Sequence, residues 1–246
     1  FPFVAQAVTQ TVDADGGADY TTIQACVNAR ACGDICQVNT KSAGDGIYDE
    51  NVIITKNCTA STVFTLKAAA AQSPKVTYTG APNSQSVAPM QIQDSNYVTV
   101  QGFEFVGTSK ATTQRACYIV GLTKTVTGNA CKDNTITNWA TNSITGAGYI
   151  GAFAIRATAV TGFRNVSPVI TGNTITGTRG YAITIGDRVD NALVSNNTIT
   201  NHKVGKASDG SYQSSAIALG ANTSVGTIAE FNTITFGETT AQAQAA

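Results

Sequence analysis

Val169-Ile170-Thr171-Gly172-Asn173-Thr174-Ile175-Thr176 is the stretch that decides the fold, because its second half recurs along the chain. The tetrapeptide Asn-Thr-Ile-Thr begins at four positions, Asn134, Asn173, Asn197 and Asn232. A strand unit this short cannot bury its apolar face alone, so it must stack on copies of itself. The repeat therefore predicts a solenoid of stacked β-strands.

The spacing of the repeat indicates the length of one turn. Asn173 and Asn197 are 24 residues apart, which fits one rung, and the flanking intervals of 39 and 35 residues indicate rungs with inserted loops. We expect the Asn before each strand to take the turn conformation and to bond to its neighbours above and below. The isoleucines alternate with threonines, so they should stack as one column inside the tube. They are Ile136, Ile175, Ile199 and Ile234.

Other short apolar segments complete each turn of the predicted solenoid. Residues 152–155, 181–185 and 216–219 are expected to form second strands, and the segments around Leu193 and Ile228 third strands. Three short strands per turn, separated by Gly, Asn or Asp corners, are typical of a parallel β-helix. An antiparallel β-sandwich is the alternative, but it provides no reason for one tetrapeptide to recur four times.

Composition excludes several classes of function. The 246 residues carry 15 basic and 15 acidic side chains, so the formal net charge is zero and no basic face for nucleic acid is expected. No apolar run reaches the length of a membrane span. We expect no signal peptide in this sequence, and residues 1–5 fit the start of a mature chain.

The cysteines indicate an oxidising compartment, and hence a secreted, extracellular or cell-surface protein. Their number is even and no zinc-site spacing is present. We expect one disulfide between Cys117 and Cys131, and pairing among the other four near the start of the solenoid. Metal ligation is the alternative, but the single histidine is distant in sequence, so no metal site is predicted. The cysteines are Cys26, Cys32, Cys36, Cys58, Cys117 and Cys131.

Four sites match the N-glycosylation pattern, which permits secretion but also arises by chance in a chain rich in Asn and Thr. The candidate residues are Asn57, Asn165, Asn196 and Asn222.

A short helix is predicted to cover the N-terminal end of the solenoid. Thr21-Thr22-Ile23-Gln24 fits a capping box with Thr21 as the N-cap and Gln24 reaching back. The helix over residues 22–29 would bury Ile23 and Val27 and hide the first unpaired strand edge. We therefore divide the chain into an arm with a capping helix (1–40), a parallel β-helix (41–236) and a C-terminal tail (237–246).

Residues 11–25, Thr-Val-Asp-Ala-Asp-Gly-Gly-Ala-Asp-Tyr-Thr-Thr-Ile-Gln-Ala, and residues 46–54, Gly-Ile-Tyr-Asp-Glu-Asn-Val-Ile-Ile, resemble the opening of pectinesterases. They also resemble the wider pectin-lyase-like family. The resemblance implies an all-β, right-handed parallel β-helix, a three-strand solenoid with a short N-terminal capping helix. It does not imply the pectinesterase activity, because the aspartate-containing strings of that family are missing and the one Gln-Asp pair is Gln93-Asp94.

Candidate residues for lyase chemistry come from the same resemblance. Pectate-lyase-like enzymes use a Lys or Arg base and usually calcium, which would be the cofactor here if the chain is a lyase; otherwise none is expected. Arg156, Arg179 and Lys203 recur at intervals of 23 and 24 residues, so they would stack along one face, with Asp187 and Arg188 beside them. Solvated charges at rung corners are the alternative interpretation.

Two functions follow from these patterns. The one favoured by the sequence is a non-catalytic, self-assembling extracellular surface or fibre subunit whose partners are other copies of itself. It rests on low charge, missing catalytic strings and a wall rich in Thr, Ala and Gly. The second is a carbohydrate-active enzyme of the polysaccharide-lyase type, acting on an acidic polysaccharide.

Overall fold

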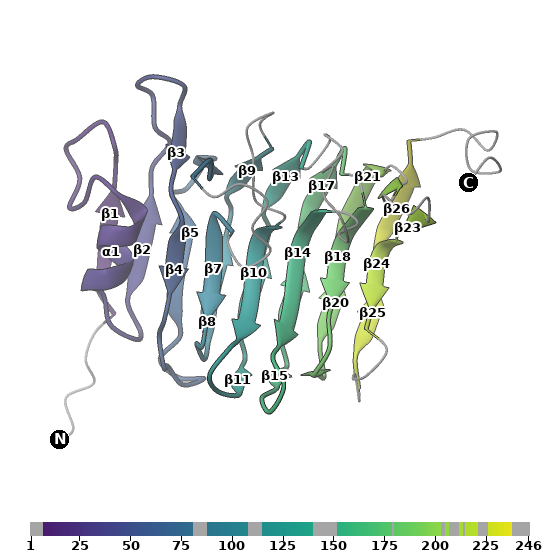
Figure 1. Cartoon of the computed structure of the whole chain (residues 1–246). Coiled ribbons are helices and arrows are strands. Elements are labelled where there is room, and N and C mark those ends of the chain that lie inside the picture. Colours follow the sequence, from purple (N-terminus) through teal and green to yellow (C-terminus); the bar gives the residue numbers. More distant parts are fainter. Residues whose placement is uncertain are drawn as a thin grey trace.

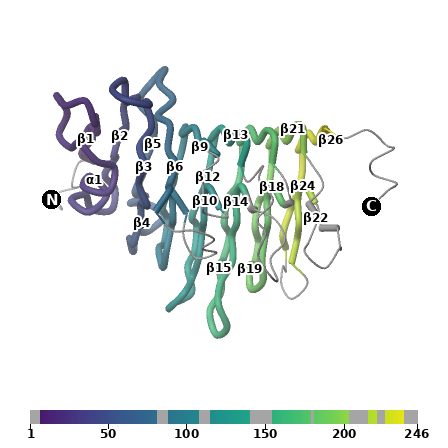
Figure 2. The backbone as a smooth tube through the Cα atoms, turned by 45° about the horizontal axis from the view of Figure 1, so that its top comes forward, coloured from purple at the N-terminus to yellow at the C-terminus, as the bar shows by residue number. Residues whose placement is uncertain are grey.

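The computed structural model describes residues 7–80, 88–107, 115–139, 152–178, 180–202, 205–206, 212–213, 215–220 and 226–237. In this part the chain winds through stacked rungs, and each strand of a long sheet pairs in parallel with the strands of neighbouring rungs (Figure 1). The rungs follow one another from the N-terminal to the C-terminal end of the stack (Figure 2). The molecule is therefore an all-β parallel β-helix, as predicted.

Three long sheets form the walls of the solenoid. Sheet A consists of β1 (Thr9–Val12), β2 (Ile35–Val38), β5 (Phe64–Ala68), β8 (Val98–Gln101), β12 (Ala130–Lys132), β16 (Val169–Thr171), β20 (Leu193–Ser195) and β25 (Ile228–Glu230). Sheet B consists of β3 (Ile47–Asp49), β6 (Lys75–Thr77), β9 (Glu104–Val106), β13 (Thr135–Thr137), β17 (Thr174–Thr176), β21 (Thr198–His202) and β26 (Thr233–Phe236). Sheet C consists of β4 (Val52–Ile54), β7 (Met90–Gln93), β10 (Arg115–Gly121), β14 (Ala152–Ala159), β18 (Gly180–Ile185) and β24 (Ser215–Leu219).

Two smaller elements complete the rungs. Sheet D consists of β11 (Val126–Thr127), β15 (Asn165–Val166) and β19 (Val189–Asp190), and it lies between sheets C and A along the chain. The strands β22 (Gly205–Lys206) and β23 (Tyr212–Gln213) pair antiparallel. One full rung therefore passes through β16, β17, β18 and β19 before β20 stacks on β16.

The predicted column of isoleucines runs through sheet B. Ile136 pairs with Ile175, Ile175 with Ile199 and Ile199 with Ile234. The first three are fully buried, because each lies between the one below and the one above. The prediction that Asn-Thr-Ile-Thr marks equivalent positions of successive rungs is confirmed.

The asparagines of the same repeat form a hydrogen-bonded ladder at the corner between sheets A and B. Oδ1 of Asn173 accepts from the backbone N of Asn134 at 3.1 Å, and Oδ1 of Asn197 accepts from the backbone N of Asn173 at 3.0 Å. The last step is the same, with Asn197 N donating to Asn232 Oδ1 at 3.0 Å. Each side chain thus satisfies a backbone donor that the corner would otherwise leave buried and unpaired.

A helix covers the N-terminal end of the stack, as predicted (Figure 2). Helix α1 (Ile23–Ala29) buries Ile23, Cys26 and Val27. Its N-cap is Thr22 rather than the predicted Thr21, and the Thr22 hydroxyl accepts from the backbone N of Ala25. The carboxylate of Glu50 accepts from the next two free N–H groups, those of Ile23 and Gln24, at 3.1 Å each. Glu50, which is 26 residues from Gln24, therefore accepts hydrogen bonds that a local capping box was predicted to satisfy.

The side chain of Gln24 closes a strand edge instead of reaching back to its own helix. Its Nε2 donates to the carbonyl of Ile53 at 3.1 Å, and its Oε1 accepts from the Ile53 N–H at 2.7 Å. Ile53 lies on β4, the edge strand of sheet C. This amide therefore replaces one residue of a missing neighbouring strand.

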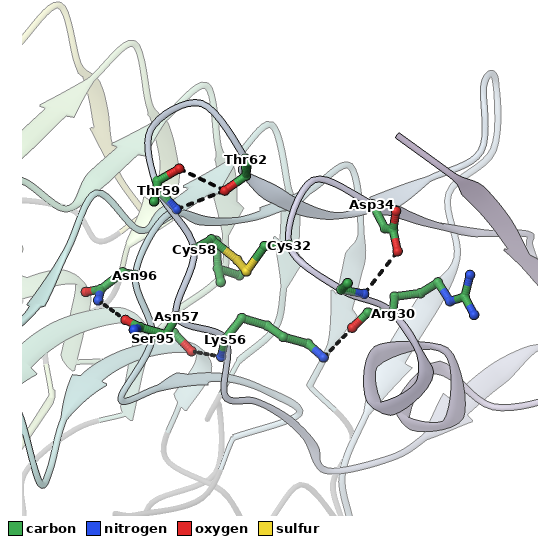
Figure 3. Close-up of a disulfide and its surroundings, with 12 residues drawn as sticks. Arg30, Cys32, Asp34, Lys56, Asn57, Cys58, Thr59, Thr62, Ser95 and Asn96 are labelled. Carbon is green, nitrogen blue, oxygen red and sulfur yellow. Dashed lines mark hydrogen bonds between the residues drawn. A yellow bond between two sulfur atoms is a disulfide. The ribbon is translucent and has the colours of Figure 1, made fainter. Parts of the chain in front are cut away.

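Two disulfides fasten the same end, and they confirm the predicted pairing among four cysteines. Cys26–Cys36 joins α1 to β2, and Cys32–Cys58 joins the segment after α1 to the segment after β4. Around the second bond, Lys56 Nζ donates to the Arg30 carbonyl at 2.6 Å (Figure 3).

The predicted disulfide between Cys117 and Cys131 is wrong. Both residues are buried free thiols, Cys117 on β10 of sheet C and Cys131 on β12 of sheet A. Each occupies the lumen-facing position of its strand, where it packs as a small apolar side chain. Burial, together with the neighbouring Cys117 thiol, raises the pKa of the Cys131 thiol well above its usual range.

The division of the chain at residues 40 and 237 stays a prediction, although β1 and β2 already belong to sheet A. No helix in the described ranges is long and apolar enough to cross a membrane.

Candidate functional site

The outer face of sheet C carries polar, aromatic and cationic side chains on neighbouring strands. The residues before and after Tyr118, which are Cys117 and Ile119, fill the lumen. Because side chains alternate between the two faces of a strand, the Tyr118 row points away from the core. In register, one residue per rung, this row contains Ile53, Gln91, Tyr118, Arg156, Thr184 and Ala218.

A second outward row runs beside the first and contains Gln93, Val120 and Thr158. Tyr118 and Val120 pack with Ala88 in a small apolar cluster that is separate from the main core. The two rows therefore place amide and hydroxyl groups next to an aromatic ring and a guanidinium group on one sheet face.

Arg115, at the start of β10, lies against this row. Its guanidinium carbon is 4.1 Å from the centre of the Tyr118 ring, which is a cation–π contact, and only 3% of the residue is exposed. Burial lowers the pKa of Arg115 to about 10; the contact with Tyr118 opposes this shift, and the charge of Arg156 adds to it. Arg115 is still protonated at neutral pH, so two guanidinium groups lie close together beside one tyrosine.

The charge on this face is one-sided. The strands of sheet C contain Arg115 and Arg156 and no Asp or Glu. Acidic residues near the strand ends bond to the backbone instead: Asp94 Oδ1 accepts from the N–H groups of Leu122 and Thr123, and Glu50 caps α1. The charged side chains carried by the described strands of sheet C are therefore both cationic.

The structure places the predicted lyase residues differently from the expectation. Arg156 lies on the outer face of sheet C, but the residue stacked above it is Thr184, because this rung is 28 residues long rather than 23. In the register of sheet C the place above Arg156 is therefore taken by Thr184, and the predicted stack of Arg156, Arg179 and Lys203 is wrong at its first step. Arg179 and Lys203 themselves lie outside the described residues.

Asp187 and Arg188 form the corner that follows β18, not the sheet face. Asp187 is exposed, and Arg188 has a φ of 61°, in the left-handed region. The backbone carbonyl of Arg188 accepts from Asn165 N at 2.9 Å, which places these two residues in the framework of sheet D. Nearby, Arg164 forms a two-pronged ion pair with Asp190, and this bond lowers the pKa of Asp190.

The four glycosylation candidates differ in their exposure to solvent. Asn165 is fully buried and its Nδ2 lies 3.3 Å from the Ile119 carbonyl, so the folded chain leaves no room for a glycan there. Asn196 is exposed at a corner, and Asn57 is also exposed, with its Oδ1 accepting from Asn96 at 2.5 Å. Asn222 lies outside the described residues.

In the described part of the chain, no cluster of side chains is suited to bind a metal ion. No group of three or more His, Cys, Asp or Glu residues is placed there to hold an ion. The single histidine, His202, is buried with its Nδ1 3.2 Å from the Thr178 hydroxyl. Calcium as the cofactor of a lyase stays a prediction.

Sequence reasoning missed Arg115 and Tyr118. Both lie in Arg115-Ala116-Cys117-Tyr118-Ile119-Val120, a short continuous apolar run that is consistent with a fully buried strand. Their position next to Arg156 depends on the register between β10 and β14, and the loop between those strands conceals it in the sequence.

Comparison with known proteins supports the fold. No protein-family model matches the sequence, and no curated protein matches it significantly. Among solved structures, an alginate lyase from Paenibacillus sp. str. FPU-7 is similar with a TM-score of 0.52 and 12% identity, over 88% of this chain and 75% of the lyase. A GH136 lacto-N-biosidase from Eubacterium ramulus is similar with a TM-score of 0.52 and 11% identity, over 91% of this chain and 55% of that enzyme. This chain therefore spans little more than half of the biosidase.

A pectate lyase, Pel9A, aligns over 94% of this chain and 80% of its own with a TM-score of 0.40 and 12% identity. The comparisons do not show the predicted resemblance to pectinesterases. At these identities the likeness concerns the architecture alone, which is the parallel β-helix fold described above.

Proposed function

We propose that this protein binds an acidic polysaccharide on the outer face of sheet C. The observation that carries the proposal is the pair Arg115 and Arg156 beside Tyr118, on a sheet whose strands contain no acidic residue. Two guanidinium groups held close together, one of them buried, favour an anion at that place. Arginine is also suited to carboxylates, because its planar fork can donate two parallel hydrogen bonds.

Arg156 is the residue that would contact the ligand, since it is partly exposed whereas Arg115 is buried. Gln93 and Thr184 are also partly exposed on the same face and would bond to sugar hydroxyls. In this arrangement Arg115 fixes the Tyr118 ring and adds positive potential. One of the fold neighbours is an alginate lyase, which agrees with an acidic polymer as the ligand.

The residues present favour elimination over hydrolysis as the accompanying chemistry. Hydrolysis of a glycosidic bond ordinarily needs two carboxyl groups across the bond, and the strands of sheet C provide none. Elimination from a uronate needs a cation on the carboxylate and a group that moves the α-proton. The α C–H bond and the β C–O bond break, a C=C bond forms, and the departing oxygen takes up a proton. Arg156 would neutralise the carboxylate, and Tyr118, which is 6% exposed and lies beside Arg156 in register, would have to turn its hydroxyl toward the sugar to transfer the proton.

The fibre role favoured by the sequence has weaker support. A head-to-tail polymer needs two open ends, and α1, Gln24 and two disulfides cover the N-terminal end. We place the protein outside the cell, since disulfides persist in oxidising compartments.

The test is equilibrium binding of alginate and polygalacturonate at low salt, with a neutral galactomannan for comparison. Loss of one charge-assisted hydrogen bond costs about 1.5–3 kcal/mol, so Arg156→Ala should weaken binding about 10- to 100-fold. Lys132→Ala is the matched control, because it removes one partly exposed positive charge from sheet A. It should change the affinity less than about twofold.

Elimination is tested separately through the ultraviolet absorbance of the unsaturated uronate product. Tyr118→Phe should abolish product formation while binding stays within about threefold of the wild type, because the ring that Arg115 contacts remains. In the binding assay, two outcomes would contradict the proposed site. One is an equal loss of affinity in Arg156→Ala and Lys132→Ala, and the other is a wild type that binds neither acidic polymer.

A further inference from the structure

The C-terminal rung leaves the core of the solenoid open. Three inner columns, one from each long sheet, end on this rung in side chains that are exposed, although the residues directly below them are fully buried. The exposed ends are Leu219 above Ile185, Ala229 above Val194 and Ile234 above Ile199. The strands that carry them, β24, β25 and β26, are also the edge strands of sheets C, A and B.

Phe231 differs in residue type from the residues at the same corner of the earlier rungs. It occupies the corner just before the asparagine ladder, where its φ is 55° and 77% of the residue is exposed. A left-handed conformation suits Gly, Asn and Asp and is unfavourable for an aromatic residue. At the same corner, the earlier rungs have Gly102, Asp133, Gly172 and Asn196, all with positive φ. An exposed Phe in a strained conformation indicates selection for contact rather than for the turn itself.

The exposed apolar area is large enough for a specific interface. Five large apolar side chains on the last rung are between 40 and 77% exposed: Leu219, Ile228, Phe231, Ile234 and Phe236. At roughly 150–250 Å² for each large side chain, they leave about 500 Å² of apolar surface. Two such surfaces bury about 1,000 Å², which is the lower limit for a specific interface. A patch of this size is comparable to the largest one on a typical monomer, about 300–600 Å², and such patches are often functional.

Of the two ends of the described stack, the C-terminal rung is the one that leaves apolar side chains for a second copy to cover. At the other end of the stack, α1 covers the lumen with Ile23, Cys26 and Val27, and Gln24 occupies the backbone groups of Ile53. Charge does not oppose self-association, since Glu230 is the one charged residue in β24, β25 and β26. It lies on the outward row of sheet A above Ser195, and so at the rim of the surface.

We propose that the C-terminal rung is a self-association surface that binds the C-terminal rung of a second copy, with Phe231 as its anchor. Like surfaces that meet across a two-fold axis form a closed dimer. Edge strands related by such an axis run antiparallel, so they can exchange backbone hydrogen bonds. The outer face of sheet C belongs to the side wall of each copy, so the dimer would carry two separate polysaccharide-binding faces.

The test is the substitution Phe231→Asn in the full chain, followed by sedimentation velocity over a wide range of concentration. Asn suits the left-handed corner, as Asn196 shows one rung below. We therefore expect a dimer dissociation constant at least tenfold higher than that of the wild type, together with an unchanged or higher unfolding temperature of the monomer. A substitution that merely damaged the fold would lower that temperature.

Ile53→Ser is the matched control. Ile53 is an exposed hydrophobic residue on the edge strand β4, at the covered end of the same sheet. The Ile53→Ser substitution should leave the dimer dissociation constant unchanged. A wild type that stays monomeric at all concentrations would overturn the proposal. So would a dimer that persists in Phe231→Asn, or assembly beyond the dimer.

Discussion

Replacing Asn173 by Ala tests the asparagine ladder that holds the rungs in register. In the structure, Asn173 Oδ1 accepts from the backbone N and from Nδ2 of Asn134, each at 3.1 Å. Its Nδ2 lies 3.0 Å from the Cys131 carbonyl and 2.9 Å from Asn197 Oδ1. The residue is fully buried, so water cannot replace these bonds.

The expected loss of stability follows from the groups left behind. The backbone N–H of Asn134 would become a buried donor without an acceptor, which costs about 1–3 kcal/mol. The space vacated by the amide adds about 1 kcal/mol at the usual cost per unit of cavity volume. We therefore expect Asn173→Ala to lower the free energy of unfolding by about 3 kcal/mol, and the unfolding temperature by about 6–12 °C for a chain of this size.

The assay is urea and thermal unfolding followed by circular dichroism. Thr174→Ala is the control, because Thr174 is the exposed next residue of the same repeat and should change stability by less than about 0.5 kcal/mol. Asn173→Asp keeps the size but turns a lone pair toward the Cys131 carbonyl, so it should be at least as destabilising as Ala at neutral pH. If Asn173→Ala and Thr174→Ala cost the same, the ladder does not carry the register.

Three further outcomes are expected. Replacing Cys32 and Cys58 together by Ala should lower the free energy of unfolding by about 3–4 kcal/mol, because the lost bond closes a loop of 26 residues; urea unfolding of the variant and the wild type without reductant, which keeps Cys26–Cys36 intact in both, measures the difference. The ion pair with Arg164 lowers the pKa of Asp190 in the folded state. The ion pair therefore stabilises the fold fully above the unfolded-state pKa of Asp, about 3.9, and this stabilisation is lost as the pH falls through the lower folded-state pKa of Asp190. Asp190→Asn should therefore lower the unfolding temperature at pH 7 but not near pH 2, and a pH-independent loss would exclude this ion pair as the cause. Expression in a glycosylating host should leave Asn165 without a glycan, because it is buried, and peptide mass spectrometry can check this.

The fold could be predicted because one face of each strand is always buried. Ile175 lies between two threonines, and the same pattern returns at Ile199, so alternation and repeat together determine which side chains enter the lumen. The N-terminal helix was also predictable from its apolar positions. Its cap was not, because the groups that complete it, Glu50 and the edge of β4, are distant in sequence.

The candidate site was much harder to predict, because it depends on register across loops of unequal length. Equal spacing in the sequence suggested Arg179 as the neighbour of Arg156, but the rungs differ in length and Thr184 takes that place. Tyr118 enters the site through its pairing with Arg156 across 38 residues of sequence. Loop insertions leave the strands unchanged while they shift the numbering, so a constant period finds the core and misses the outer face.

Cysteine pairing shows the same limit. An even count predicts disulfides as a group. Which sulfurs bond depends on which residues the fold brings together, and the count does not give this. Cys36 lies on the same inner column of sheet A as Cys131, but Cys36 is bonded to Cys26 of the covering helix, whereas Cys117 and Cys131 remain thiols.

A crystal structure of the protein soaked with a uronate oligosaccharide tests the central claim most directly. We predict that the sugar chain lies on the outer face of sheet C, with one carboxylate within hydrogen-bonding distance of the Arg156 guanidinium and hydroxyl groups near Gln93 and Thr184. An oligosaccharide bound along the threonine rows of sheet B, or one that leaves Arg156 in contact with solvent alone, would contradict the proposed function.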